Sequence, residues 1–302
     1  MAKLQNGAAA PFGGGVYGGC QDAMLVSNNG YQTDQNFGGR SDFEVGESPN
    51  IFSAPRHTLI RFDVTSLAGQ FLSISNVTLR LFVTVPSSIN RGDTLQAFSL
   101  ASANSDWIGG SGVGANNGEP EDLGMSTWAQ EIQGSANWAG SAGASTPGVD
   151  YVDAPLATFG YASTNVAVGS YIDLVFTNTG IFTDWVAGIN PGLLLRTASE
   201  ADSELIFASS QSATVQWRPQ LIVNYRPNTP ETNVLSLRVS QVELCWPSTS
   251  GSMYQVQYRS DLTTNIWTDL GIPVQGKDST TCIYDAVLPG APRKFYRFVA
   301  AP

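Results

Sequence analysis

The stretch VTLRLFVTV, residues 77–85, decides the fold class of this chain. Its β-branched and aromatic residues alternate with period two, which predicts a β-strand with one face turned to a core. Short segments of the same kind, separated by turn residues, recur on both sides of it, at 22–26, 42–45, 59–64, 94–99, 156–158, 171–176, 192–196, 204–209 and 220–225. Only IFTDWVA, residues 181–187, predicts a helix, of one or two turns. The chain is therefore predicted to be all-β.

The composition supports this prediction. Charged residues make up 13% of the 302 residues, and there are only three lysines, whereas helical surfaces are usually rich in Lys and Glu. Gly, Ser, Thr and Asn are plentiful, as expected of many short strands joined by tight turns. A hydrophobic content of 42% is enough to build a core.

The net charge of −10 argues against a nucleic-acid partner, because phosphate binding needs clustered Lys and Arg. No apolar run reaches the 18 or so residues that a membrane helix needs, so no membrane span is predicted. The first residues, MAKLQNGAAAPFGGG, contain no apolar stretch of signal-peptide length. Secretion or a cell-surface location is therefore expected from the composition and the resemblance described below, without a signal peptide in this numbering.

The chain divides into two predicted domains. Residues 1–226 are predicted to form a large β-sandwich. Residues 227–230 (PNTP) form a linker that contains two prolines, and residues 231–302 form a second series of strands. The second series, at 234–239, 242–246, 254–260, 267–270, 281–286 and 294–299, suits a small sandwich of the fibronectin type III or immunoglobulin kind. In that domain Cys245 and Cys282 both fall in strand-like segments. They form either a disulfide or two buried thiols, and Cys20 is left unpaired.

Several short stretches occur in a characteristic order: QDAML (21–25), NFG (36–38), LIRFDV (59–64), SISNVTLRL (73–81), DW (106–107), TW (127–128), DW (184–185), PGLLL (191–195) and RPQL (218–221). Through them, residues 12–225 resemble the bacterial DNRLRE domains, which are related to the disaggregatase repeats and to an alginate-binding family of carbohydrate modules. The resemblance implies a jelly-roll β-sandwich that accompanies extracellular enzymes or adhesins. The C-terminal stretches YQVQY (254–258) and FYR (295–297) resemble the fibronectin-like tails of bacterial secreted proteins.

A long segment, residues 108–155, carries the candidate glycan-binding residues. It is rich in Gly, Ala, Ser and Asn and contains three widely spaced large aromatics, and an excursion of this length inside a compact domain is usually functional or disordered. Sugar rings stack on exposed aromatics, while amides take their hydroxyls by hydrogen bonding. The predicted glycan-binding residues are Trp128, Trp138, Tyr151, Asn116, Asn137 and, in a loop near the first strand, Tyr31. The alternative is that these aromatics pin long loops to the sandwich. In contrast, Trp185 and Trp217 are predicted to lie in the core of the large domain, and Trp246 and Trp267 in that of the small one.

A structural Ca²⁺ is the one cofactor that the sequence suggests. Calcium takes six to eight oxygen ligands, which sandwich loops supply from Asp, Asn and backbone carbonyls. The predicted ligands are Asp22, Asn28 and Asp34; Asp150 with Asp153 is a second acidic neighbourhood. The alternative is that these acidic residues cap backbone amides in turns.

Catalysis is not expected. The single histidine, His57, would have to serve any Ser-His-Asp triad, and no G-x-S-x-G motif occurs. A pair of carboxylates for glycoside cleavage stays open, with candidates in the long segment at Glu119, Glu121, Asp122 and Glu131.

Three functions follow from these patterns. The first is a non-catalytic extracellular protein that binds neutral or weakly acidic polysaccharides, since the chain lacks the basic cluster that an acidic glycan such as alginate needs. The second is a structural or adhesive surface subunit that self-associates through sheet edges. The third is a glycan-cleaving enzyme.

Overall fold

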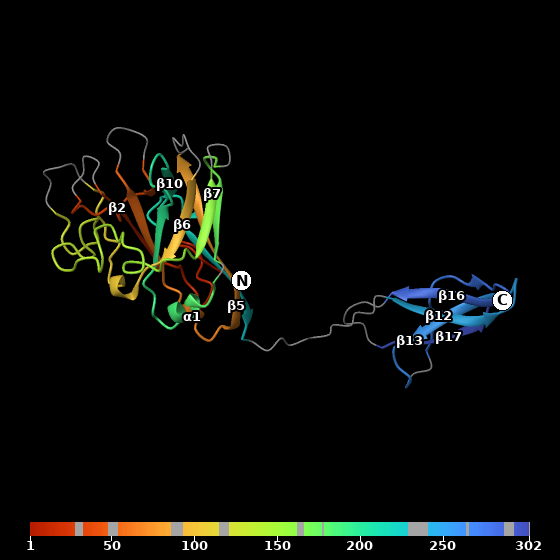
Figure 1. Cartoon of the computed structure of the whole chain (residues 1–302). Helices are drawn as coiled ribbons and strands as arrows, with labels where there is room; N and C mark the ends of the chain where they lie inside the picture. The colour runs from red at the N-terminus through yellow and green to blue at the C-terminus, as the bar shows by residue number, and fades with distance from the viewer. Residues whose placement is uncertain are drawn as a thin grey trace. The chain divides into compact units, whose positions relative to one another are not determined.

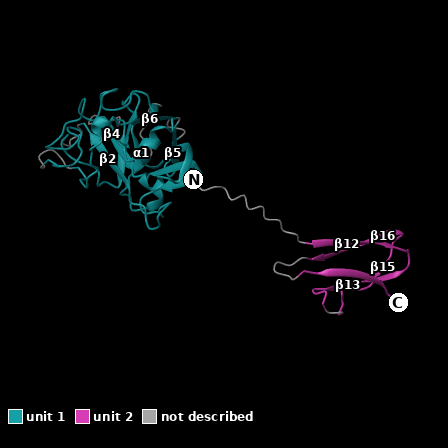
Figure 2. Cartoon of the chain, turned by 90° about the horizontal axis from the view of Figure 1, so that it is seen from below, with its two compact units in different colours: residues 1–230 teal, residues 231–302 magenta. Residues whose placement is uncertain are grey.

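The computed structural model describes residues 1–27, 33–47, 54–85, 93–114, 121–161, 166–176, 178–228, 241–263, 266–286 and 293–301. The chain forms two compact units, Met1–Pro230 and Glu231–Pro302, shown in different colours in Figure 2. Both are built almost entirely from antiparallel β-strands, so the predicted all-β class is confirmed. Among the described residues, no helix has the length and apolar character to cross a membrane.

The large unit is a sandwich of two sheets (Figure 1). The six-stranded sheet has the order β1 (Ala2–Leu4), β11 (Gln220–Pro227), β5 (Phe71–Val85), β10 (Leu205–Ala208) and β3 (Asp42–Val45), with β8 (Tyr171–Phe176) also paired to β5. The five-stranded sheet has the order β2 (Cys20–Val26), β4 (Arg56–Phe62), β9 (Leu193–Thr197), β6 (Asp93–Ser99) and β7 (Ala157–Tyr161). The chain changes sheet at most connections, as in jelly-roll sandwiches.

Short helical turns join some of these strands. They are η1 (Thr65–Leu67), η2 (Ser102–Asn104), η3 (Val215–Trp217) and the single α-helix of the described residues, α1 (Ile181–Val186). The helix lies where the sequence predicted it. It buries Phe182 and Trp185, whose rings meet edge to face at 4.6 Å, so Trp185 is a core residue as predicted.

The core lies between the two sheets and follows the alternation of the strands. On β5 every second residue, from Val77 to Val83, is fully buried, and their neighbours Thr78, Arg80 and Phe82 point to the other face. Strand β11 extends two residues beyond the predicted 220–225, because Arg226 pairs with Ser73 and Pro227 with Phe71; the first residue of the predicted linker is therefore part of the sheet. Strand β1 was not predicted from the sequence.

The outer face of the five-stranded sheet is covered by the described residues of the segment 100–156, called the excursion below. Leu25 of β2, Leu59 of β4 and Leu194 of β9 are buried there against Trp107 and Trp138 of this segment. In Figure 1 the segment appears as the yellow-green loops beside β2. Because both faces are covered, nearly every residue of β2, β4 and β9 is buried, rather than every second one. Among the described residues, no segment covers the outer face of the six-stranded sheet to the same extent, as the alternating exposure of β8 shows.

The small unit has two sheets. One pairs β12 (Gln241–Ser248) with β16 (Ser279–Ala286); in the other, β13 (Met253–Arg259) pairs with β14 (Thr268–Asp269), β15 (Val274–Gln275) and β17 (Phe295–Ala300). Trp246 is buried against Tyr254 and Phe298, as predicted. Trp267 was wrongly predicted as core: its half-buried ring lies between two guanidinium groups, 4.4 Å from that of Arg259 and 4.3 Å from that of Arg297. The strand expected at 234–239 lies outside the described residues.

Candidate functional site

Two of the aromatics predicted to bind glycan are buried and cannot act as exposed platforms. Trp138 is 5% and Tyr151 is 3% exposed. The indole of Trp138 donates to the carbonyls of Thr127 and Trp128, at 3.2 and 3.1 Å, and the Tyr151 hydroxyl accepts a bond of 2.8 Å from Arg196. Both side chains therefore pin the excursion to the five-stranded sheet, which corrects their prediction as stacking surfaces.

The other predicted glycan residues have different positions. Trp128 is only partly buried and packs against the ring of His57, with 5.1 Å between ring centroids. Asn137 is exposed and accepts a bond of 2.7 Å from the Gln130 amide. Tyr31 and Asn116 lie outside the described residues. No cluster of exposed aromatics therefore forms within the described part of the excursion.

The predicted calcium ligands do not converge in the described residues. Asp22 is buried and accepts a bond of 2.7 Å from the backbone N–H of Ser210, and its burial raises the pKa of this carboxyl to about 6. The Oδ1 atom of Asp34 is buried and has no hydrogen-bond partner among the described residues. Asn28 lies outside the described residues. The calcium site therefore stays a prediction.

Asp150 instead caps backbone amides, as the alternative for acidic turn residues proposed. It accepts bonds of 2.7, 2.9 and 2.8 Å from the N–H groups of Gly140, Ser141 and Thr146, and a fourth from the Asn104 amide. Burial opposes the ionisation of this carboxyl, but the four hydrogen bonds outweigh it and lower its pKa. Asp150 thereby organises the excursion.

The acidic residues considered for glycoside cleavage are also engaged within the structure. Glu131 is buried, which raises the pKa of its carboxyl, and it accepts a bond of 2.9 Å from the N–H of Asp106. Glu121 accepts a bond from the Gln133 amide, and Asp122 one from the backbone N–H of Asn36, while Glu119 lies outside the described residues.

A different site lies on the uncovered face of the six-stranded sheet. We call it the aromatic face and define it by Phe82, Tyr171, Trp217, Arg80 and Asp173. Trp217 stacks on Phe82 with 4.8 Å between centroids and planes 6° apart, while Tyr171 meets Phe82 edge to face at 5.1 Å. Phe82 is nearly buried by its two neighbours, and Tyr171 and Trp217 are each 41% exposed. Two aromatic rings are thus held rigidly at the surface.

The strand register builds this face. Phe82 of β5 pairs with Tyr171 of β8, and Arg80 pairs with Asp173, so all four point outward from the sheet. The turn η3 brings Trp217 over Phe82, and the Tyr171 hydroxyl fixes this turn by donating to the Gln216 carbonyl at 2.9 Å. Trp217 was predicted to lie in the core. The structure corrects this prediction, because η3 is a short helical turn outside the sheet and none of its residues is buried.

Charge on the aromatic face is balanced. The guanidinium of Arg80 donates from Nε and Nη2 to the two carboxylate oxygens of Asp173, both at 2.7 Å, and these bonds raise the pKa of Arg80. The same guanidinium lies 5.6 Å from the Tyr171 ring. The two exposed aromatics are therefore next to a paired cation and anion, a surface that offers both donors and acceptors with no net charge.

A cleft of about 260 Å³ at one end of the sandwich is a weaker candidate. Arg61, Asp63 and Asn190 line it, and each of them has a hydrogen bond within the chain. Arg61 donates to the carbonyls of Ser105 and Trp107, Asp63 accepts from Thr65, and Asn190 donates to the Phe62 carbonyl. The indole of Trp185, which also lines the cleft, is buried.

Comparison with known proteins does not assign a family. No protein-family model matches this chain, and no curated protein sequence is similar to it.

Proposed function

We propose that the protein is a non-catalytic polysaccharide-binding protein whose large unit binds glycan on the aromatic face. One observation carries the proposal: Tyr171 and Trp217 are both 41% exposed and both pack on Phe82, on a face of the six-stranded sheet that the described residues leave largely open. Single exposed apolar residues are common, but aromatics that adjoin one another form an apolar patch of the kind that marks a binding site.

The chemistry of the face suits a sugar chain. The apolar C–H faces of a pyranose ring stack on aromatic rings, and the ring hydroxyls need donors and acceptors beside them. Arg80 and Asp173 supply both, as an exposed bidentate pair. Because this pair is neutral overall and the chain carries a charge of −10, a neutral or weakly acidic glycan is favoured over a strongly anionic one.

An extracellular location accompanies this proposal. The small unit contains a disulfide between Cys245 and Cys282, and disulfides persist mainly in oxidising compartments outside the cytosol. Binding to an extracellular polysaccharide is the role that fits both features.

Binding measurements with the full chain test the proposal. Affinity electrophoresis against a panel of soluble neutral polysaccharides, with alginate as the acidic member, should find at least one neutral or weakly acidic ligand. Trp217→Ala and Tyr171→Ala should each weaken that binding about tenfold, because each removes a stacking surface. Tyr284→Ala is the control, since Tyr284 is an exposed aromatic of the small unit. This variant should bind the polysaccharide with unchanged affinity.

Other results would contradict the proposal in distinguishable ways. Binding that survives both substitutions but is lost in Trp128→Ala would move the site to the excursion. Absence of binding together with ordered oligomers in light scattering would favour a structural surface subunit. Release of reducing sugar that disappears in Glu121→Gln or Glu131→Gln would indicate an enzyme.

A further inference from the structure

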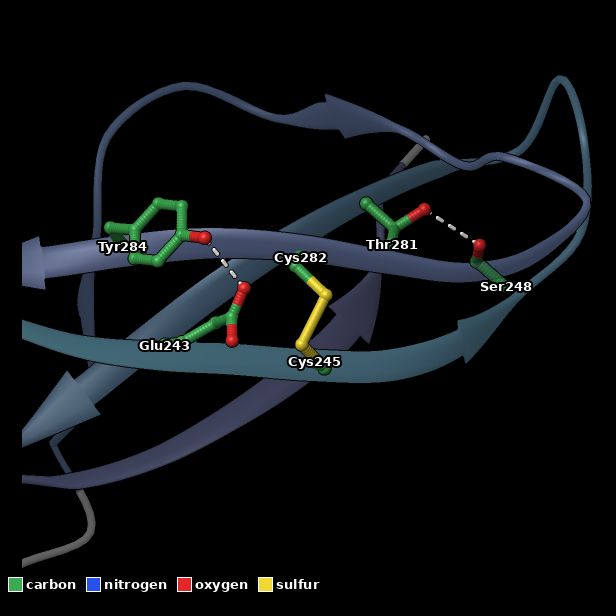
Figure 3. The surroundings of a disulfide bond; sticks show 6 residues. All are labelled: Glu243, Cys245, Ser248, Thr281, Cys282 and Tyr284. Carbon is green, nitrogen blue, oxygen red and sulfur yellow. Dashed lines mark hydrogen bonds between the residues drawn. A yellow bond between two sulfur atoms is a disulfide. The ribbon is translucent and has the colours of Figure 1, made fainter.

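Four side chains gather on the outer face of the β12–β16 sheet (Figure 3). Cys245 pairs with Cys282 and Glu243 pairs with Tyr284, and the two pairs lie two residues apart along each strand. Side chains two residues apart share a face of the sheet, so all four point to the same side. All are exposed, whereas Trp246 on the opposite face of β12 is buried. Solvent therefore has direct access to this group.

The ligand atoms of three of these residues are close enough to share one metal ion. A carboxylate oxygen of Glu243 and the Sγ atoms of Cys245 and Cys282 all lie within 4.8 Å of one another. Among the described residues this is the one place where three His, Cys, Asp or Glu ligands converge. In the structure the two sulfurs are bonded to each other, so the group exists in its oxidised form.

The strand pairing places the two sulfurs together independently of their bond. β12 and β16 are paired over eight consecutive positions, from Gln241 with Ala286 to Ser248 with Ser279. Beside the disulfide, the hydroxyls of Ser248 and Thr281 form a bond of 2.7 Å, and Trp246 anchors β12 to the other sheet through Phe298. Reduction would thus leave two thiols side by side on a paired sheet.

We propose that reduction of the Cys245–Cys282 disulfide creates a site for one thiophilic divalent cation, such as Zn²⁺, held by both thiolates and the Glu243 carboxylate. The reductant is a dithiol. One of its thiolates attacks a cysteine sulfur, which breaks the disulfide and releases the other cysteine as a thiolate; its second thiol then displaces the first cysteine. The dithiol is oxidised to a disulfide and the protein gains two electrons and two protons. The two cysteine protons are released when the cation binds.

The donor set selects the class of metal. Thiolates favour soft or borderline cations such as Zn²⁺ and Cd²⁺ over Mg²⁺ or Ca²⁺. Three protein ligands leave a fourth tetrahedral position for water. Tyr284 acts as a positioning residue, because its hydroxyl donates to Oε1 of Glu243 at 2.6 Å and orients the carboxylate.

Cadmium titration of the full chain tests this site. The chain is reduced under native conditions with a phosphine, freed of reductant without oxygen, and titrated with Cd²⁺ while the ultraviolet thiolate-to-cadmium charge-transfer absorption is followed. The reduced chain should bind one Cd²⁺, which Zn²⁺ displaces, and the oxidised chain none. Cys245→Ser should abolish the absorption. Glu243→Gln should weaken binding at least about tenfold, while Asp269→Asn, an exposed acidic control in the same unit, should not change it.

Two measurements keep the outcome clear. Thiol titration of the reduced, folded chain should find two reactive thiols, since Cys20 is buried in the large unit, and limited proteolysis should leave the small unit intact. Unfolding of the small unit on reduction would mean that the disulfide serves only to stabilise the fold, and it would overturn the proposal. Absence of cadmium binding by the folded, reduced chain would overturn it too, as would equal binding in Glu243→Gln.

Discussion

The ring of His57 joins the excursion to the sandwich through two short hydrogen bonds. Its Nε2 lies 2.7 Å from Oε1 of Glu200, and its Nδ1 lies 2.6 Å from the carbonyl oxygen of Gly143 in the excursion. Both ring nitrogens are therefore engaged, one by the sandwich and the other by the excursion. Glu200 also pairs with Arg196, which in turn donates to Tyr151 of the excursion. The one histidine of the chain is thus structural.

The first prediction concerns this link. His57→Ala should lower the free energy of unfolding by about 3 kcal/mol, because it removes a buried ring and leaves Glu200 and the Gly143 carbonyl without their hydrogen-bond partner. Urea denaturation followed by tryptophan emission measures the loss. Asn137→Ala is the control: it removes a hydrogen bond of an exposed residue and should change the stability by less than about 0.5 kcal/mol. Equal effects of the two substitutions would show that His57 does not hold the excursion.

The second prediction concerns Asp150 and acid. Its hydrogen bonds lower the pKa of the carboxyl in the folded state, so the carboxylate contributes stability above the pKa of the unfolded chain and loses it as the pH falls through the folded value. Asp150→Asn should therefore destabilise the chain at neutral pH and flatten the loss of stability in acid.

Limited proteolysis at neutral pH locates the Asp150 effect. Cleavage of Asp150→Asn should begin between residues 104 and 150, where the carboxylate binds its donors. Asp153→Asn, at an exposed position three residues away, should be cleaved like the unsubstituted chain. First cleavage outside the excursion would refute the role of Asp150 as its organiser.

Local patterns predicted the strands, and tertiary contacts decided the candidate site. Alternation over residues 77–85 gave β5 its inward and outward faces correctly, and 171–176 was predicted as a strand, but the common face of Tyr171 and Asp173 beside β5 was found only in the structure. Trp217 could not be placed this way, because its exposure depends on η3 folding back over Phe82, some 130 residues earlier in the sequence.

The burial of the aromatics in the excursion could not be predicted from local patterns either. Its aromatics are spaced through a polar, glycine-rich segment, and this pattern suits an exposed binding loop as well as a covering layer. Burial of Trp138 and Tyr151 follows from the apolar outer face of the five-stranded sheet, whose residues Leu25, Leu59 and Leu194 need a partner. That need becomes visible only once β2, β4 and β9 are known to be neighbours.

The last prediction concerns Asp22, whose response to pH is opposite to that of Asp150. Burial raises the pKa of Asp22 from 3.8 to about 6 in the folded chain, so the folded state binds the proton more tightly than the unfolded state does. Its ionisation consequently lowers the free energy of unfolding as the pH rises from about 4 to about 6, by about 3 kcal/mol in total.

Asp22→Asn cannot ionise and keeps an oxygen that accepts from the N–H of Ser210. The difference in unfolding free energy between pH 4 and pH 7 should therefore shift by this amount in the variant, toward greater relative stability at pH 7. Urea denaturation at both pH values measures it, with the exposed Asp63→Asn as control. A shift of the same size in both variants would show that burial of Asp22 is not its cause.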